Sequence, residues 1–279
     1  MDRSALLLKI RRDIDRRNKT DMKLYPWMVF AVLTLYTFVA FYRGLFFDDD
    51  LEIRSFSIVV VGSGLVLAIM YVMATRVNKH NKRDAALMTD VCDLLDDIVT
   101  EESDRAYIGK MRDQIPETAK QSVLFILFFA TLFPAAFGAL IYALGLGPDP
   151  DNLALNLIMV SFVLGLIIIL ININFPRVHE KRFIRFSDTA VDLFASLGVA
   201  VKGYGRVIGG RNIYFLVLLS IVTLGVFIVV WLCISMWDFN RHIDEQWNFE
   251  DNVLEAMKLL VLRGPGFGLP SPDGQMQDS

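Results

Sequence analysis

The stretch Leu153–Ile173 reads LALNLIMVSFVLGLIIILINI and contains no Asp, Glu, Lys, Arg or His. An uncharged apolar helix of about 20 residues, at 1.5 Å per residue, is long enough to cross the hydrocarbon layer of a bilayer. Lipid offers no hydrogen-bond partners, so such a segment has to be helical. Four further runs share this character: Tyr25–Phe41, Ser57–Ala74, Val123–Leu146 and Ile213–Trp237. The sequence therefore predicts an all-α, polytopic membrane protein with five transmembrane helices.

Composition agrees with this class of protein. The chain has 279 residues and is 54% hydrophobic, whereas soluble domains are typically about 45–50% apolar. Its net charge of −3 is too small to indicate a nucleic-acid partner. The two cysteines, Cys92 and Cys233, fall in different settings and show no metal-type spacing. The polar first 24 residues do not resemble a secretory signal peptide, so we expect the first run to be retained as an anchor.

The basic residues predict an orientation. Segments 1–24, 76–120 and 175–211 each carry seven or eight Lys or Arg, whereas 43–55 carries two and 147–152 none. Basic loops stay on the cytoplasmic side of a membrane. We therefore expect a location in a membrane, most simply the plasma membrane, with a cytoplasmic amino terminus. Five crossings would place the carboxyl terminus outside.

Three stretches outside the runs show helical periodicity. Apolar residues recur every three or four positions in 84–98 and in 183–197, which indicates two cytoplasmic amphipathic helices. The stretch 4–17 is also amphipathic, and its polar side is basic. Such a helix beside a membrane can contact anionic lipid. The alternative is that it packs on its own helical neighbours.

The first half of the chain resembles the second half after a shift of 99 residues. The first two runs then fall on the third and fourth, and His80-Asn81-Lys82-Arg83 falls on His179-Glu180-Lys181-Arg182. This pattern favours an internal duplication, although apolar runs also resemble one another by composition. The predicted organisation is a basic segment 1–24, a first repeat 25–120, a second repeat 121–211, a fifth span 212–237, an acidic amphipathic segment 238–263 and a disordered tail 264–279.

The three histidines, His80, His179 and His242, each follow the end of an apolar run. Asp238, His242 and Glu245 fall on one helical face, and a histidine with two carboxylates can hold a divalent metal. The histidines could instead form a pH-sensitive switch or simply lie at a membrane interface. A tail on the outer side would keep His242 apart from the other two. If the tail segment copies the histidine-bearing helices, however, it belongs on their side, and the span count is wrong by one.

The remaining polar residues give little sign of catalysis. The runs contain no charged side chain of the kind that couples ion transport, and their polar candidates for lining a pore are Ser161, Asn172 and Asn174. A phosphate-binding loop, a Gly-x-Ser-x-Gly elbow and a His-Glu-x-x-His motif are all missing. The sequence therefore predicts a protein that is not an enzyme and needs no cofactor.

Three functions are consistent with these features. The leading hypothesis is a non-catalytic membrane scaffold or complex subunit, whose cytoplasmic amphipathic helices contact other membrane subunits or further copies of the chain. The second is an oligomeric channel or facilitator for a small solute or ion. The third is a metal- or pH-responsive membrane protein that uses the three histidines.

Overall fold

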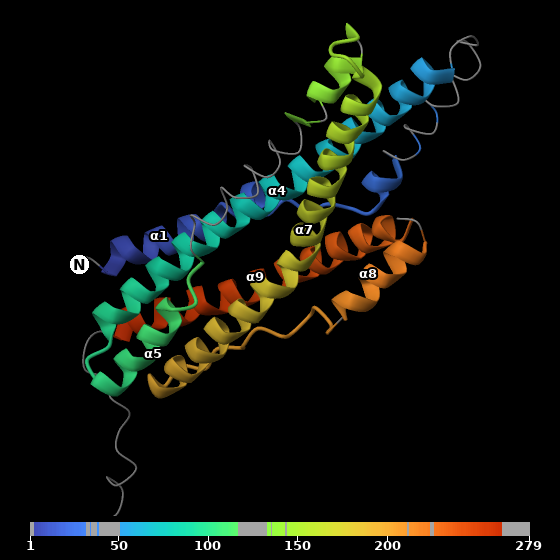
Figure 1. Cartoon of the computed structure of the whole chain (residues 1–279). Helices are drawn as coiled ribbons and strands as arrows, with labels where there is room; N and C mark the ends of the chain where they lie inside the picture. Colours follow the sequence, from blue (N-terminus) through green and yellow to red (C-terminus); the bar gives the residue numbers. More distant parts are fainter. Residues whose placement is uncertain are drawn as a thin grey trace, which may run out of the picture.

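A computed structural model gives the fold, and every secondary-structure element with assigned bounds among the residues it describes is a helix (Figure 1). The all-α part of the prediction is therefore confirmed. The described residues are 3–31, 34, 38, 51–116, 133–134, 136–142, 144–210, 212–223 and 226–263. The helices with assigned bounds are α1 (Arg3–Asp15), α2 (Arg17–Thr20), α4 (Leu51–Ile98), α5 (Glu102–Arg112), α7 (Pro150–Ser196), α8 (Ile213–Val222) and α9 (Val226–Arg263).

Three long helices, α4, α7 and α9, dominate the molecule. They contain 48, 47 and 38 residues, and each continues from an apolar run into a charged amphipathic half without a break. Their charged halves pack together with α1 and α5, while α8 lies against α9 (Figure 1). The predicted boundary at residue 237 accordingly falls inside a continuous helix. The predicted disordered tail 264–279 lies outside the described residues.

The main hydrophobic core lies where the predicted amphipathic helices meet. Apolar side chains from 84–98 and 183–197 pack against each other, α1 and α9, and the most enclosed are Leu6, Ile10, Leu94, Leu95, Leu193, Phe194 and Met257. The apolar faces that the scaffold hypothesis reserves for partners thus contact one another within this chain. The stretch 4–17 packs on its helical neighbours, as the second interpretation of its sequence had it. Its contact with anionic lipid stays a prediction.

The segment after α7 is set by the end of that helix. Gly198 has a φ of 70°, a left-handed conformation that glycine adopts without a side-chain clash. Its backbone N–H donates to Ala195 O, and the N–H of Val199 donates to Phe194 O. This pair of bonds is the Schellman arrangement, which ends a helix and satisfies its last carbonyls. The chain then returns along the bundle and brings Tyr204 back beside α7.

The fifth apolar run is two helices rather than one. Asn212 caps the start of α8 by accepting from the N–H of Tyr214, at 2.9 Å. The helix ends after ten residues, at Val222. Thr223 then accepts a hydrogen bond from the N–H of Phe227, in the first turn of α9. The helices α8 and α9 form a hairpin (Figure 1), so the end of the run turns back toward α4 and α7.

The predicted five-span membrane protein is wrong. Among the residues that the structure describes, no helix combines the length and the apolar character that a bilayer crossing requires. The fifth run folds into a hairpin, while the second and fourth are parts of helices that continue into a charged bundle. Residues 32–33, 35–37 and 39–41 of the first run and residues 123–132, 135 and 143 of the third lie outside the described residues. An integral membrane location is therefore not supported. The same holds for the predicted plasma membrane, the cytoplasmic amino terminus and the outer carboxyl terminus, because each depended on the five spans.

The two longest helices correspond in position. Shifted by 99 residues, α4 begins at the residue where α7 begins, and the two helices end within one residue of each other. Leu94 and Leu193, which the shift superimposes, are both fully buried. This correspondence favours the duplication, which stays a prediction.

Candidate metal centre

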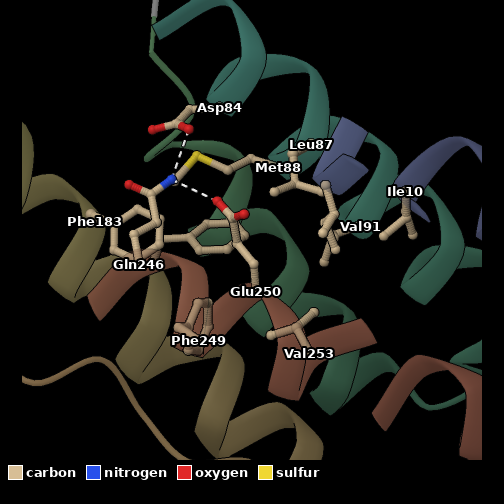
Figure 2. A pocket seen from close by; sticks show the side chains of 12 residues that line it. Ile10, Asp84, Leu87, Met88, Val91, Phe183, Gln246, Phe249, Glu250 and Val253 are labelled. Carbon is tan, nitrogen blue, oxygen red and sulfur yellow. Dashed lines mark hydrogen bonds between the residues drawn. The ribbon is translucent and has the colours of Figure 1, made fainter. Parts of the chain in front are cut away.

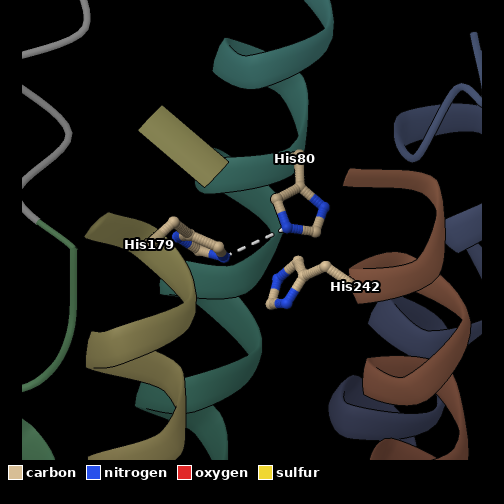
Figure 3. A group of neighbouring side chains, drawn as sticks. All are labelled: His80, His179 and His242. Carbon is tan, nitrogen blue, oxygen red and sulfur yellow. Dashed lines mark hydrogen bonds between the residues drawn. The ribbon is translucent and has the colours of Figure 1, made fainter. Parts of the chain in front are cut away.

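Three helices bring the histidines of the chain together. His80 comes from α4, His179 from α7 and His242 from α9, and the three rings face a common point (Figure 3). One ring nitrogen of each residue lies within 4.8 Å of the others. Their exposed fractions are 0%, 3% and 0%. Three buried imidazole rings in mutual contact are unusual, because each ring carries polar nitrogens that need hydrogen-bond partners.

His80 lies between two carboxylates. Its Nδ1 is 3.1 Å from Oδ1 of Asp21, and its Nε2 is 3.1 Å from Oδ2 of Asp84, one turn along α4. Because a carboxylate oxygen accepts, Nδ1 of His80 donates its proton to Asp21. Burial alone would lower the pKa of His80, but the charges of Asp84 and Asp21 outweigh it and raise the pKa to about 9.

His179 shares the same contacts through Nε2. This nitrogen is 3.1 Å from Oδ2 of Asp84 and 3.2 Å from Nε2 of His80. Its ring stacks on Phe175, with centroids 5.5 Å apart. Burial is the main reason that the pKa of His179 lies below its ordinary value, although the contact with Asp84 opposes that shift. The neutral form of His179 is the one that can donate a lone pair to a metal.

His242 is oriented by a chain of hydrogen bonds. Oε1 of Glu180 accepts from the backbone N–H groups of Val207 and Ile208, at 2.8 and 2.9 Å. The hydroxyl of Tyr204 donates to the same oxygen at 3.0 Å and lies 2.8 Å from Nδ1 of His242. Since the one hydroxyl proton is given to Glu180, Nδ1 of His242 carries the proton and donates it to Tyr204.

This arrangement leaves Nε2 of His242 with a free lone pair. The nitrogen is buried and has no hydrogen-bond partner. Burial and the neighbouring histidines hold the pKa of His242 well below its ordinary value, so Nε2 stays unprotonated. An outer partner that fixes the tautomer of a histidine in this way is typical of metal centres.

A buried ion network supports the histidines from one side. Arg83 donates to both carboxylate oxygens of Glu250, at 2.8 and 2.7 Å, and also contacts Asp84 and Asp21. Trp247 donates from Nε1 to Oδ2 of Asp21 at 2.8 Å. These contacts link α4, α9 and the segment after α2, and they hold both carboxylates that touch His80.

A small cavity is lined by Asp84, Gln246 and Glu250 together with apolar side chains (Figure 2). Its volume is about 20 Å³, room for roughly one water molecule. Gln246 stands at its wall and donates from Nε2 to Asp84 and Glu250, at 2.7 and 2.8 Å. None of the three histidines lines this cavity.

The candidates from the sequence are only partly brought together. His242 joins His80 and His179 rather than Asp238 and Glu245, neither of which belongs to the histidine group. Glu245 instead accepts from the N–H of Gly205 at 3.3 Å. The expectation that His242 lies apart from the other histidines, which followed from an outer tail, is wrong because α8 and α9 form a hairpin.

The candidate pore residues all lie on α7, ahead of His179. Ser161 is buried and Asn174 is half-buried, while the side chain of Asn172 lies outside the described residues. Their role in a pore stays a prediction.

Sequence reasoning missed the residues that support the histidines. Asp84 could have been found, because it follows His80 by four positions on a predicted helix. Asp21 and Tyr204 lie in irregular segments, and Glu180 was noted only as part of the repeat. No sequence spacing relates these residues to the histidines that they contact.

Comparison with known proteins adds no precedent for this centre. No family model matches the chain, and no curated protein or solved structure is significantly similar to it. The class of the site therefore follows from its geometry: a buried cluster of three imidazoles in a helical bundle.

Proposed function

We propose that the protein is metal-responsive, and that it binds one divalent transition-metal ion between His80, His179 and His242. The observation that carries the proposal is the buried Nε2 of His242, which has no hydrogen-bond partner and lies with the other two rings. Imidazole nitrogen suits Zn²⁺, Cu²⁺, Fe²⁺ and Ni²⁺. Zn²⁺ fits best, because it accepts a small tetrahedral set of nitrogen and oxygen ligands.

Binding would stabilise the packing of the bundle. The ligands come from α4, α7 and α9, so a bound ion joins the three long helices at one point. An unfolded chain does not hold its histidines together, and the free energy of binding therefore adds to the free energy of folding. The response to metal is then a change in the stability of the bundle.

The direct test is metal stoichiometry and thermal stability. Protein stripped with a chelator is titrated with Zn²⁺, and we expect one ion per chain and a rise of several degrees in Tm at saturation. Changing His242 to Gln should abolish both effects. Glu245→Gln is the matched control, because Glu245 lies on the same helix outside the histidine group. A stripped protein that binds no Zn²⁺, Co²⁺ or Ni²⁺ contradicts the proposal.

A further inference from the structure

Asp84 points one carboxylate oxygen into the histidine cluster. Oδ2 lies 3.1 Å from Nε2 of both His80 and His179, and these two nitrogens are 3.2 Å apart. The three atoms form a nearly equilateral triangle. In a tetrahedral zinc site with bonds of about 2.0–2.1 Å, neighbouring ligand atoms lie about 3.3 Å apart. The triangle therefore has nearly the dimensions of one face of a zinc tetrahedron.

The same oxygen already faces the position of an ion. Oδ2 of Asp84 is buried, and its neighbours in the cluster are Nε2 of His80 and of His179, each at 3.1 Å. A bound ion would replace the protons between this oxygen and the two nitrogens. The other oxygen, Oδ1, accepts from Arg83 at 2.8 Å and from Gln246 at 2.7 Å. These bonds fix the orientation of the carboxylate, as outer partners of a ligating carboxylate do.

Nε2 of His242 supplies the fourth corner. It is a buried atom in this cluster without a hydrogen-bond partner. One ring nitrogen of His242 lies within 4.8 Å of one on each of the other two histidines, and Asp84 does not belong to that group. The His242 ring therefore has to move toward the triangle before its nitrogen can bond to an ion held there.

The four ligands leave no position for an outside molecule. The side chains of His80 and Asp84 are fully enclosed, and only 2% of the side-chain surface of His179 is exposed. The cavity next to Asp84 is lined mainly by apolar side chains and by none of the three histidines. Structural zinc sites are closed with four protein ligands, whereas catalytic sites keep one position for water or substrate.

We infer that Asp84 is the fourth ligand of a closed, tetrahedral site for a zinc-class ion, formed with His80, His179 and His242. This inference rests on the proposed metal binding and adds the ligand set and the class of site. A closed site holds helices together and does not activate water.

Cobalt spectroscopy tests the coordination directly. The protein loaded with Co²⁺ should show the intense visible bands of a tetrahedral ion, and added azide should leave its spectrum unchanged. In Asp84→Ala the fourth position is open, so azide or formate should change the spectrum. The affinity for Zn²⁺ should fall by more than about 100-fold, beyond the 10–100-fold effect of an outer partner.

Two further variants separate ligation from structural damage. Asp84→Asn keeps the shape of the side chain and serves if Asp84→Ala does not fold; it should weaken Zn²⁺ binding and make the Co²⁺ spectrum sensitive to azide. Gln246→Ala removes a hydrogen bond from Oδ1 of Asp84 but keeps Oδ2, so its spectrum should stay tetrahedral and insensitive to azide.

The outcomes distinguish the two proposals. A protein that binds no metal contradicts the proposed function. A protein that binds one Co²⁺ but shows a five- or six-coordinate spectrum, or responds to azide without mutation, contradicts the closed site alone. Zn²⁺ affinity that is unchanged in Asp84→Asn also overturns the role of Asp84.

Discussion

The helices α4 and α7 have nearly the same bounds after a shift of 99 residues, yet they contribute different chemistry to the centre. Each carries a histidine at the matched position, His80 and His179, but the residue four positions later is Asp84 in α4 and Phe183 in α7. His80 contacts the carboxylates of Asp84 and Asp21, while His179 contacts the carboxylate of Asp84 alone and lies against the rings of Phe175 and Phe183. Two helices with matching bounds thus place a carboxylate on one side of the histidine cluster and aromatic rings on the other.

The largest difference between the two helices is expected at Arg83 and Arg182, which directly precede Asp84 and Phe183. Arg83 is enclosed and holds Glu250 with two hydrogen bonds, whereas the matched Arg182 is half-buried. Changing Arg83 to Met leaves the charge of Glu250 buried without its partner and should lower the free energy of unfolding by about 3–5 kcal/mol. Arg182→Met should cost less than about 1 kcal/mol. Urea unfolding of the two variants measures the difference, and equal losses would remove the contrast between the helices.

The two histidines should also differ in their effect on pH dependence. In the metal-free protein His80 has a pKa of about 9 against an ordinary value of 6.5. Its contribution to stability is complete below pH 6.5 and is lost as the pH rises through 9. We expect the free energy of unfolding to fall by about 2 kcal/mol between pH 7 and 9. His179 and His242 have lowered pKa values, so their contribution is lost instead as the pH falls below 6.5.

Chelator-treated protein unfolded in urea at several pH values measures this dependence. The variant Asp21→Asn removes one of the charges that raise the pKa of His80. It should therefore show a smaller loss between pH 7 and 9. Stability that is constant or increases over that interval would contradict the role of the carboxylates.

A substitution of Phe183, four positions after His179, separates metal binding from packing. Phe183 is buried and its ring meets that of His242 edge-on, with centroids 5.7 Å apart. Phe183→Leu should cost about 1–1.5 kcal/mol of stability through imperfect repacking and leave the Zn²⁺ stoichiometry at one. Chelator competition and urea unfolding test both expectations. Loss of the bound ion in this variant would mean that Phe183 positions His242.

The smallest effect is expected at a matched pair of small side chains. Cys92 in α4 is fully buried with a free thiol, and the matched residue in α7 is the partly buried Val191. Burial raises the pKa of Cys92 to about 12, so the thiol should not react with a disulfide reagent in the folded protein. Cys92→Val should change the free energy of unfolding by less than about 1.5 kcal/mol. A larger loss would show that the two helices pack differently at this level.

The sequence predicted the helical class and the amphipathic halves of α4 and α7 because periodicity depends on neighbours along one helix. It missed the hairpin of α8 and α9, since hydropathy alone does not show that Thr223 ends one helix and caps the next. It also could not show that Arg83 and Glu250 are paired inside the core, because they lie 167 positions apart. Part of the charge in this bundle is therefore internal, where the periodicity of one helix gives no sign of its partners.

The three histidines were named together in one functional hypothesis, but the predicted outer tail kept His242 apart from the other two. The repeat related His80 to His179, and only a tail on their side could bring His242 to them. Tyr204 depends on the turn at Gly198, which brings an irregular segment back along α7. Such tertiary contacts leave no periodic signal in the sequence.

The hairpin of α8 and α9 also has a consequence for the order of folding. His80 and His179 are 99 positions apart, and His242 enters only when α9 has turned back against both helices. Contacts between such distant positions close large loops and form slowly. The centre should therefore assemble in the last step of folding, and a metal ion should slow unfolding much more than it speeds folding.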